Sequence, residues 1–203
     1  MSFAEVAALT IHDVKNRLAQ LAGRAETRGD VETLRMALEA SETLTRLLVF
    51  YKSETGLLGL EIDAHAPADL ATELAKETGG LGKFAIEADC SNAPALWFYD
   101  ETLVRMLLAN ALHNALRYAR KQIVIAVTDL GDYLEFSVRD DGNGYPEEML
   151  ADTEASAPVT REGTGLGLRL AKRIAEMHEN GGRRGEIRLS NEGGAVFRLM
   201  LPK

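Results

Sequence analysis

Apolar residues in the first quarter of the chain recur every three or four positions. Over residues 3 to about 27 the steps alternate between four and three, which predicts a helix with one apolar seam. The seam residues are Ala7, Ile11, Val14, Leu18, Leu21 and Ala25. Similar spacing predicts a second helix over residues 31 to about 54, with its seam at Leu34, Leu38, Leu44, Leu48 and Tyr51. Gly29 suits the end of the first helix and Asp30 the cap of the second, so the pattern predicts a tight helical hairpin.

Two amphipathic helices form only half of a four-helix bundle and leave an apolar face in water. We therefore expect a homodimer in which two antiparallel hairpins cover these faces. Residues 55–67 contain glycines and a proline, which indicates a connection to a second domain, with a short strand near residues 60–63. The predicted domains are residues 1–56 and residues 57–203.

After residue 67 the pattern changes to short strands that alternate with helices. Helices are predicted near residues 69–77, 100–119 and 165–178. Strands are predicted near residues 83–89, 95–98, 122–129, 133–139, 186–190 and 195–201. Most strands are neighbours joined by short turns, which indicates antiparallel pairing with helices on one face. The predicted fold class is therefore α+β, a helical hairpin followed by an α/β sandwich.

Composition narrows the class of protein. The 203 residues are 46% hydrophobic, carry a net charge of -8 and include one cysteine, Cys90. A single cysteine forms no internal disulfide, and it has no partner at the spacing of a zinc site. The acidic balance argues against nucleic acid as a partner. No apolar run approaches the roughly 20 residues of a membrane span, and residues 1–10 lack the features of a signal peptide, so we expect a cytoplasmic protein.

The predicted helix at residues 100–119 has two distinct faces. Its apolar stripe consists of Val104, Leu108, Ala111, Ala115 and Ala119. Asn110, Asn114 and Arg117 cluster on the other side, within about 60° of one another. Amide oxygens suit a hydrated magnesium ion and a guanidinium suits phosphate oxygens. The alternative is a solvated helix face with incidental asparagines.

The segment VRDDGNGYP, residues 138–146, follows a predicted strand. Asp140 ends that strand, and its carboxylate is suited to accept an exocyclic amine. Gly142 and Gly144 would let a flat ring approach the backbone closely. The alternative is an ordinary turn, because Asp-Gly and Asn-Gly are favoured turn pairs.

The segment GTGLGL, residues 163–168, opens the next predicted helix. Backbone N–H groups at a glycine-rich helix start suit an anionic phosphate. The spacing GxGxG differs from the GxGxxG of dinucleotide-binding folds, and no GxxxxGK[ST] loop is present. The polar residues 145–162 that precede it indicate either a mobile lid or a loose loop.

These segments in this order resemble the N, G1 and G2 boxes of the GHKL ATPase superfamily. Preceded by a helical hairpin that carries HDVKN, residues 12–16, they resemble the core of a bacterial two-component sensor histidine kinase. The resemblance extends from about residue 5 to the terminal FRLMLP. It implies a dimeric four-helix bundle for the hairpin, with a histidine phosphotransfer role, and a GHKL-type (Bergerat) ATP-binding domain for the rest.

The resemblance also implies roles for single residues. Asn114 would coordinate Mg²⁺, and Asn110, Arg117 and Tyr118 would contribute to the pocket for the nucleotide and its phosphates. Asp140 would bind the adenine amine of ATP, with two glycines beneath the ring, Gly142 and Gly144. The residues that would wrap the phosphates are Gly163, Thr164, Gly165, Leu166 and Gly167.

His12 would be the phosphoacceptor. It lies about 100° around the helix axis from Ile11 of the seam. This position is at the edge of the bundle, where the imidazole ring can be reached from outside. Asp13 beside it would take the other ring proton and hold the tautomer. Asn16 shares this face and suggests phosphatase activity on the aspartyl phosphate of a partner. Arg17 stands where many such hairpins carry a proline, so we expect the helix to continue without a kink.

The predicted activity is that of an ATP-dependent protein-histidine kinase that passes a phosphoryl group from His12 to a response regulator receiver domain. One alternative is a dimeric histidine phosphotransfer protein that does not use ATP, and another is a regulatory binding module switched by ATP. His12 lies close to Met1. We therefore expect either an excised core or a soluble kinase whose input comes from a separate sensor protein.

Overall fold

The computed structural model describes residues 3–79, 85–150 and 165–203. The chain divides into two compact units, Met1–Leu58 and Gly59–Lys203. The first is all helical and the second combines helices with a five-stranded sheet. The predicted α+β class is confirmed.

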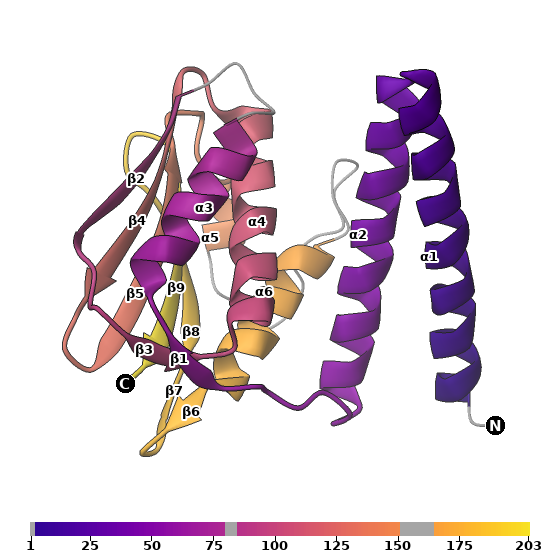
Figure 1. The fold of residues 1–203 in the computed structure, drawn as a ribbon. Helices are drawn as coiled ribbons and strands as arrows, with labels where there is room; N and C mark the ends of the chain where they lie inside the picture. The colour runs from indigo at the N-terminus through magenta and orange to yellow at the C-terminus, as the bar shows by residue number, and fades with distance from the viewer. Residues whose placement is uncertain (1–2, 80–84, 151–164) are drawn as a thin grey trace. The chain divides into compact units, whose positions relative to one another are not determined.

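The first unit is a hairpin of α1 (Phe3–Arg28) and α2 (Val31–Glu54), which pack side by side along their length (Figure 1). Gly29 has a φ of 67°, and the Asp30 side chain accepts a hydrogen bond from Thr33 N at 3.0 Å. These are the predicted helix end and cap. Helix α1 continues through Arg17 without interruption, as expected in the absence of a proline.

The apolar seam of the hairpin is only partly covered within one chain. The buried apolar residues of the described hairpin are Ala25 of the seam and the neighbouring Ala22 and Ala37. Larger seam residues remain exposed, with Val14 38% exposed, Leu21 44% and Leu38 51%. The small alanines allow close approach of the two helices, whereas the large side chains stay exposed in a single chain.

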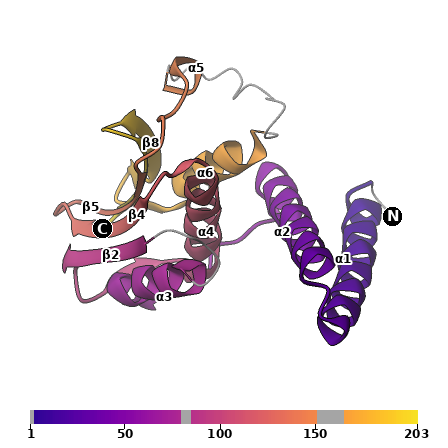
Figure 2. The same ribbon diagram turned by 90° about the horizontal axis from the view of Figure 1, so that it is seen from above.

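The second unit is built on a sheet with strand order β2-β4-β5-β9-β8. The strands are β2 (Ala85–Asn92), β4 (Gln122–Asp129), β5 (Tyr133–Asp140), β8 (Glu186–Asn191) and β9 (Ala195–Pro202). One face of the sheet is covered by three helices (Figures 1 and 2), which are α3 (Pro67–Gly79), α4 (Glu101–Tyr118) and α6 (Leu166–Met177). The shorter elements are β1 (Asp63–His65), β3 (Trp97–Tyr99), α5 (Glu147–Leu150), β6 (Glu179–Asn180) and β7 (Arg183–Arg184).

The core lies between the sheet and the helices. Alternate residues of β4 and β5 are buried, as the period of a strand requires; they are Ile123, Ile125, Val127, Leu134, Phe136 and Val138. The buried stripe of α4 faces this layer and is wider than predicted, with Leu103, Leu107 and Leu112 in addition to Val104, Leu108, Ala111 and Ala115. This broad buried stripe fixes which side of α4 faces the sheet and which side faces away from it.

Three features of the second unit differ from the prediction. Strand β2 pairs with β4 in parallel, with Ala85 opposite Gln122, because β3 and α4 intervene and no tight turn reverses the chain. The predicted strand at residues 60–63 begins only at Asp63 and pairs with β3 in a separate small sheet. The β6–β7 hairpin and helix α5 were not predicted, because such short elements carry no periodic pattern.

Candidate functional site

Helix α4 presents the predicted polar face. Its N-cap is Asp100, whose Oδ1 accepts a hydrogen bond from Leu103 N at 2.9 Å. Asn110 is half-buried, whereas Asn114 is exposed in the next turn. At the end of the helix the Arg117 guanidinium lies 5.7 Å from the ring centroid of Tyr118. The two amides and the guanidinium therefore lie on one polar side of α4, as the spacing predicts.

Asp140 ends β5 and is only 7% exposed. Its Oδ1 accepts hydrogen bonds from Gly142 N at 2.7 Å and from Ala195 N at 3.3 Å. Among the described residues, none donates a hydrogen bond to Oδ2. A buried carboxylate with one unused oxygen suits a ligand that donates an N–H group.

Gly142 brings the loop after Asp140 against the end of α4. A Cβ at this position would lie 2.4 Å from the carbonyl oxygen of Tyr118, so no other residue fits without a backbone shift. Asp141 strengthens this junction because its Oδ1 accepts hydrogen bonds from Arg120 N at 2.7 Å and Lys121 N at 3.0 Å. These backbone bonds lower the pKa of Asp141 below its ordinary value.

The start of α6 lies against the polar face of α4. Gly165 is the N-cap of α6 with a φ of 65°, a left-handed conformation that favours glycine. A Cβ on Gly167 would lie 2.7 Å from Asn110 Nδ2. The contact places Gly167 and Asn110 side by side, although they come from two different predicted motifs. Leu166 begins the helix, and Gly163, Thr164 and most of the predicted lid lie outside the described residues.

The turn between β8 and β9 supports the Asp140 loop, and sequence reasoning did not single it out. A Cβ on Gly194 would lie 2.0 Å from the carbonyl oxygen of Asp140. Asn191 Oδ1 accepts a hydrogen bond from Tyr145 N at 2.7 Å, and its Nδ2 donates to Tyr145 O at 2.9 Å. The only signal in the sequence is the pair of glycines in NEGGA, residues 191–195, between the last two predicted strands.

On the hairpin, the His12 side chain is 70% exposed and the Asp13 side chain 77%. The Nδ2 of Asn16 lies 3.3 Å from His12 Nδ1, within hydrogen-bond distance. Asp13 Oδ1 lies 4.0 Å from the same ring nitrogen, too far for a hydrogen bond. Asn16, and not Asp13, is therefore the direct ring contact in this arrangement.

The other described histidines lie elsewhere. His65 Nδ1 lies 3.0 Å from Glu101 Oε2. His178 is 3% exposed and hydrogen-bonded within the second unit. His113 is exposed on α4. The accessible ring of His12 contrasts with the buried ring of His178.

Comparison with known proteins decides the family. The family model described as "Histidine kinase-, DNA gyrase B-, and HSP90-like ATPase" matches residues 99–203, which include Asn110, Asp140 and Gly167. The chain belongs to this family. As a member of these ATPases it carries their ATP-binding domain, and the resemblance to a two-component histidine kinase core is confirmed by its relatives.

One such relative is the signal transduction histidine-protein kinase AfsQ2 of Streptomyces coelicolor, which is 30% identical over 171 residues, 80% of this chain and 30% of that protein. This chain spans 24 to 30% of the length of three of the curated relatives that it matches. No helix that the structure describes in this ATPase-family chain has the length and apolar character needed to cross a membrane.

Solved structures agree with the assignment of this chain to the family. Full-length ShkA in complex with AMPPNP superposes with a TM-score of 0.73 over 99% of this chain and 46% of that chain, at 21% identity. The catalytic domain of histidine kinase ThkA has a TM-score of 0.61 over 71% of this chain and 99% of that chain, at 25% identity. The likeness to ShkA shows a shared fold.

Proposed function

We propose that this ATPase-family chain is an ATP-dependent protein-histidine kinase that phosphorylates His12 and passes the phosphoryl group to an aspartate of a response regulator receiver domain. One observation carries the proposal. The same chain holds an exposed histidine on a helical hairpin and a buried Asp140 whose Oδ2 accepts no hydrogen bond from the described residues. A phosphoacceptor must be accessible, and a nucleotide-selective carboxylate must be shielded from water.

The polar surface of the second unit fits Mg-ATP. Asp140 Oδ2 would accept the amine of adenine, and the exposed amide oxygen of Asn114 would hold Mg²⁺. The Arg117 guanidinium would meet phosphate oxygens, and the N-terminal turn of α6, from Gly165 to Gly167, would offer its backbone N–H groups. Bound Mg²⁺ would neutralise charge on the phosphates.

His12 would act as the nucleophile. The lone pair of its Nε2 would form a bond to the γ-phosphorus, while the bond from that phosphorus to the bridging oxygen breaks and ADP leaves. This requires the tautomer with the proton on Nδ1. A 180° turn of the Asn16 amide would present its oxygen to that proton, and Asp13, 4.0 Å from Nδ1, would stabilise the positive ring.

The incompletely covered seam of the hairpin supports a homodimer. Val14, Leu21 and Leu38 are exposed in a single chain, and a second hairpin would bury them in a four-helix bundle. We propose this bundle as the dimer interface. Sedimentation of the whole chain should give twice the monomer mass, and a double Leu21→Asp, Leu38→Asp variant should sediment as a monomer.

A second activity is favoured by the contact between His12 and Asn16. An amide that lies 3.3 Å from the ring nitrogen is placed to orient a water molecule at the same surface. We propose that Asn16 supports hydrolysis of the aspartyl phosphate on the response regulator. Asn16→Ala should slow dephosphorylation of an added phosphorylated regulator strongly, and should lower but not abolish labelling of His12, because the amide also holds the ring tautomer.

The decisive experiment is incubation with Mg²⁺ and γ-labelled ATP. The wild type should acquire label that is labile to acid and stable to alkali, and His12→Gln should lose it. His65→Gln is the matched control, because His65 pairs with Glu101 in the second unit, and it should keep the label.

The alternatives predict other results. Nucleotide binding without any label would favour the ATP-switched binding module. A chain that neither binds nucleotide nor takes label, but accepts phosphate on His12 from a phosphorylated regulator, would be a phosphotransfer protein.

A further inference from the structure

The carboxamide of Asn191 makes a two-point contact with the backbone of Tyr145. Its oxygen accepts the N–H of Tyr145 at 2.7 Å and its nitrogen donates to the carbonyl of Tyr145 at 2.9 Å. Asn191 is the last residue of β8, an edge strand of the sheet, and Tyr145 lies 46 positions earlier in the chain. The side chain therefore pairs with Tyr145 as a neighbouring strand would.

Gly144 makes this pairing possible. Its φ is 82°, and an added Cβ would lie 2.6 Å from both Cγ and Oδ1 of Asn191. The backbone of Gly144 thus lies directly against the Asn191 amide. A side chain at Gly144 would push the loop away and break both hydrogen bonds.

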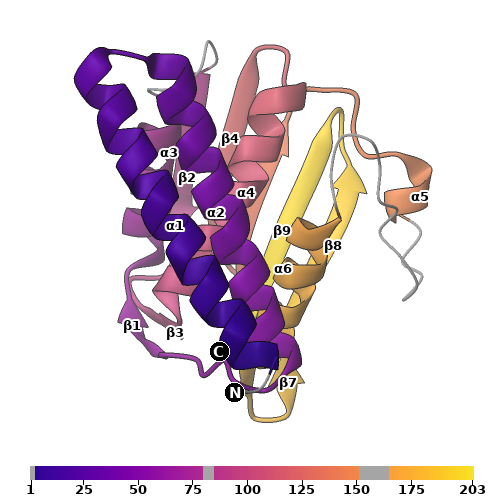
Figure 3. The same ribbon diagram turned by 90° about the vertical axis from the view of Figure 1, so that its right-hand side faces the viewer.

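The same turn also holds the other end of the loop. Ala195, which is opposite Asn191 in the β8–β9 register, donates its N–H to Asp140 Oδ1 at 3.3 Å. Gly194 packs against the Asp140 carbonyl oxygen. Both ends of residues 140–145 are therefore anchored by residues 191–195. Figure 3 shows α5, which follows Tyr145, on the β8 side of the sheet.

From this double anchorage we infer that Asn191 is a positioning residue for the nucleotide, because it holds the Gly142–Gly144 backbone where the adenine ring must lie. The inference rests on the proposed function, since it assigns a role in ATP binding. Asn191 does not touch the reacting atoms. It acts by keeping the loop in its binding conformation before ATP arrives, which removes an ordering cost from binding.

The positioning role predicts a particular kinetic pattern. Without the two hydrogen bonds, fewer molecules have the loop in place, so the KM for ATP rises while the rate at saturating ATP stays unchanged. A role only in global folding would instead lower kcat, because fewer molecules are active, and would leave the KM of the folded fraction unchanged. The two roles are therefore separable in one experiment.

The experiment measures autophosphorylation of the whole chain against ATP concentration for the wild type and Asn191→Ala. We expect the KM for ATP to rise about tenfold, in line with the loss of two exposed hydrogen bonds, with kcat unchanged. Asn180→Ala is the matched control. Asn180 Nδ2 also donates to a backbone carbonyl, that of Lys203 at 2.6 Å, but from the β6–β7 hairpin. It should leave both constants unchanged.

Nucleotide binding by calorimetry tests the same point without catalysis. Asn191→Ala should weaken the binding of adenosine and the binding of ATP by the same factor, since the proposed contact of the loop is with the base. An unchanged KM and unchanged adenosine affinity in Asn191→Ala, beside an active wild type, would overturn the inference and leave the proposed function intact. A wild type that binds no nucleotide would overturn both.

Discussion

The Nε2 atom of His178 accepts a hydrogen bond from the backbone N–H of Asp100 at 3.1 Å, and its Nδ1 lies 2.9 Å from the carbonyl oxygen of Ile174. The ring can satisfy both partners only when it is neutral with the proton on Nδ1. His178 lies just after α6 and Asp100 just before α4. The buried imidazole therefore joins the two helices that carry the glycine and asparagine motifs.

Stability should depend on pH through His178. Burial lowers the pKa of this ring below its ordinary value. The unfolded chain takes up the proton near pH 6.5, whereas the folded chain takes it up only at lower pH, so the unfolded state binds more protons in between. The free energy of unfolding should fall as pH drops below about 6.5.

Urea unfolding of the wild type and His178→Gln at pH 7.5 and 5.5 checks this prediction. Glutamine offers a hydrogen-bond acceptor and a donor but does not titrate in this range. The difference in the free energy of unfolding between pH 7.5 and pH 5.5 should therefore be smaller in the variant. An equal pH dependence in both proteins would show that other groups cause it.

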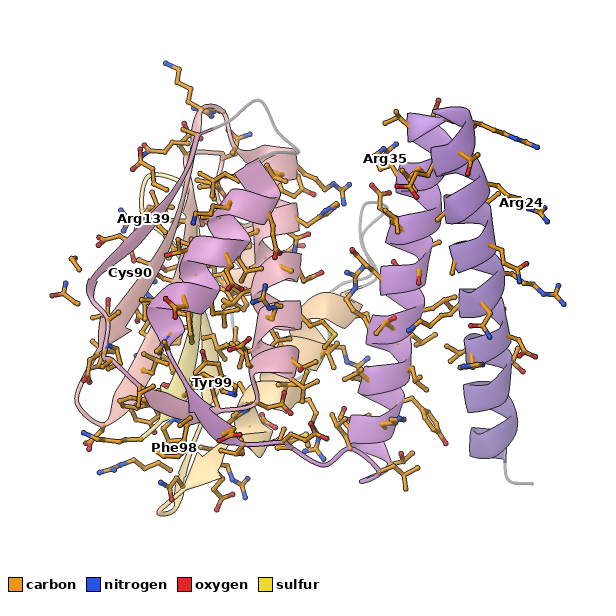
Figure 4. The ribbon with its side chains drawn as sticks, in the orientation of Figure 1. Arg24, Arg35, Cys90, Phe98, Tyr99 and Arg139 are labelled. Carbon is orange, nitrogen blue, oxygen red and sulfur yellow. The ribbon has the colours of Figure 1, made fainter. Side chains whose placement is uncertain are left out.

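The hydroxyl group of Tyr99 should destabilise the folded protein. Tyr99, which is labelled in Figure 4, is fully buried. Its ring centroid lies 5.3 Å from that of His65 and 5.8 Å from that of Phe136. Within the described part of the chain its hydroxyl has no hydrogen-bond partner. Tyr99→Phe should therefore raise the free energy of unfolding by about 1 kcal/mol.

Chemical denaturation measures this change, and Tyr133→Phe is its control. Tyr133 is only half-buried, so its hydroxyl reaches water. Loss of this hydroxyl should change the free energy of unfolding by less than about 0.5 kcal/mol. A clear loss of stability in Tyr99→Phe would indicate that water satisfies the buried hydroxyl.

Gly23 weakens the hairpin. It lies within α1, where a glycine costs helix stability, and a Cβ there would meet nothing within 4 Å. Gly23→Ala should raise the melting temperature and stabilise the helix by about 0.5–1 kcal/mol. Gly59→Ala, also without a neighbour within 4 Å but outside any helix, should have a smaller effect. A destabilised Gly23→Ala protein would mean that another chain packs closely at this position.

Asp140 should select the base of the nucleotide. Its carboxylate would accept the amine of adenine, whereas guanine has a carbonyl oxygen at the corresponding position and would be repelled. Asp140→Asn should weaken ATP binding by about tenfold or more and should reduce the preference for ATP over GTP. Calorimetric titration with both nucleotides measures this. Asp129→Asn, at the far end of β4 in an exposed turn, should behave as the wild type.

The helices could be predicted closely from sequence because their signals are local. Apolar spacing, Gly29 and Asp30 define the hairpin without reference to the rest of the chain. The grouping of Asn110 and Asn114 also follows from helix periodicity alone.

Contacts between distant segments could not be predicted. The parallel pairing of β2 depends on the path through β3 and α4, and nothing within β2 specifies its direction. The role of Asn191 depends on Tyr145, 46 positions away, and a lone asparagine after a strand is also typical of a turn. The contact between Gly167 and Asn110 likewise arises only when α6 packs beside α4.

The position of β9 has a consequence for synthesis of the protein. This strand, residues 195–202, lies between β5 and β8, and Pro202 pairs with Tyr133. A nascent chain that stops before β9 has no partner for β8 and exposes the long edge of β5. Folding of the second unit must therefore wait until residue 202 has left the ribosome, and the proposed pairing of the hairpin with a second copy can begin in that interval.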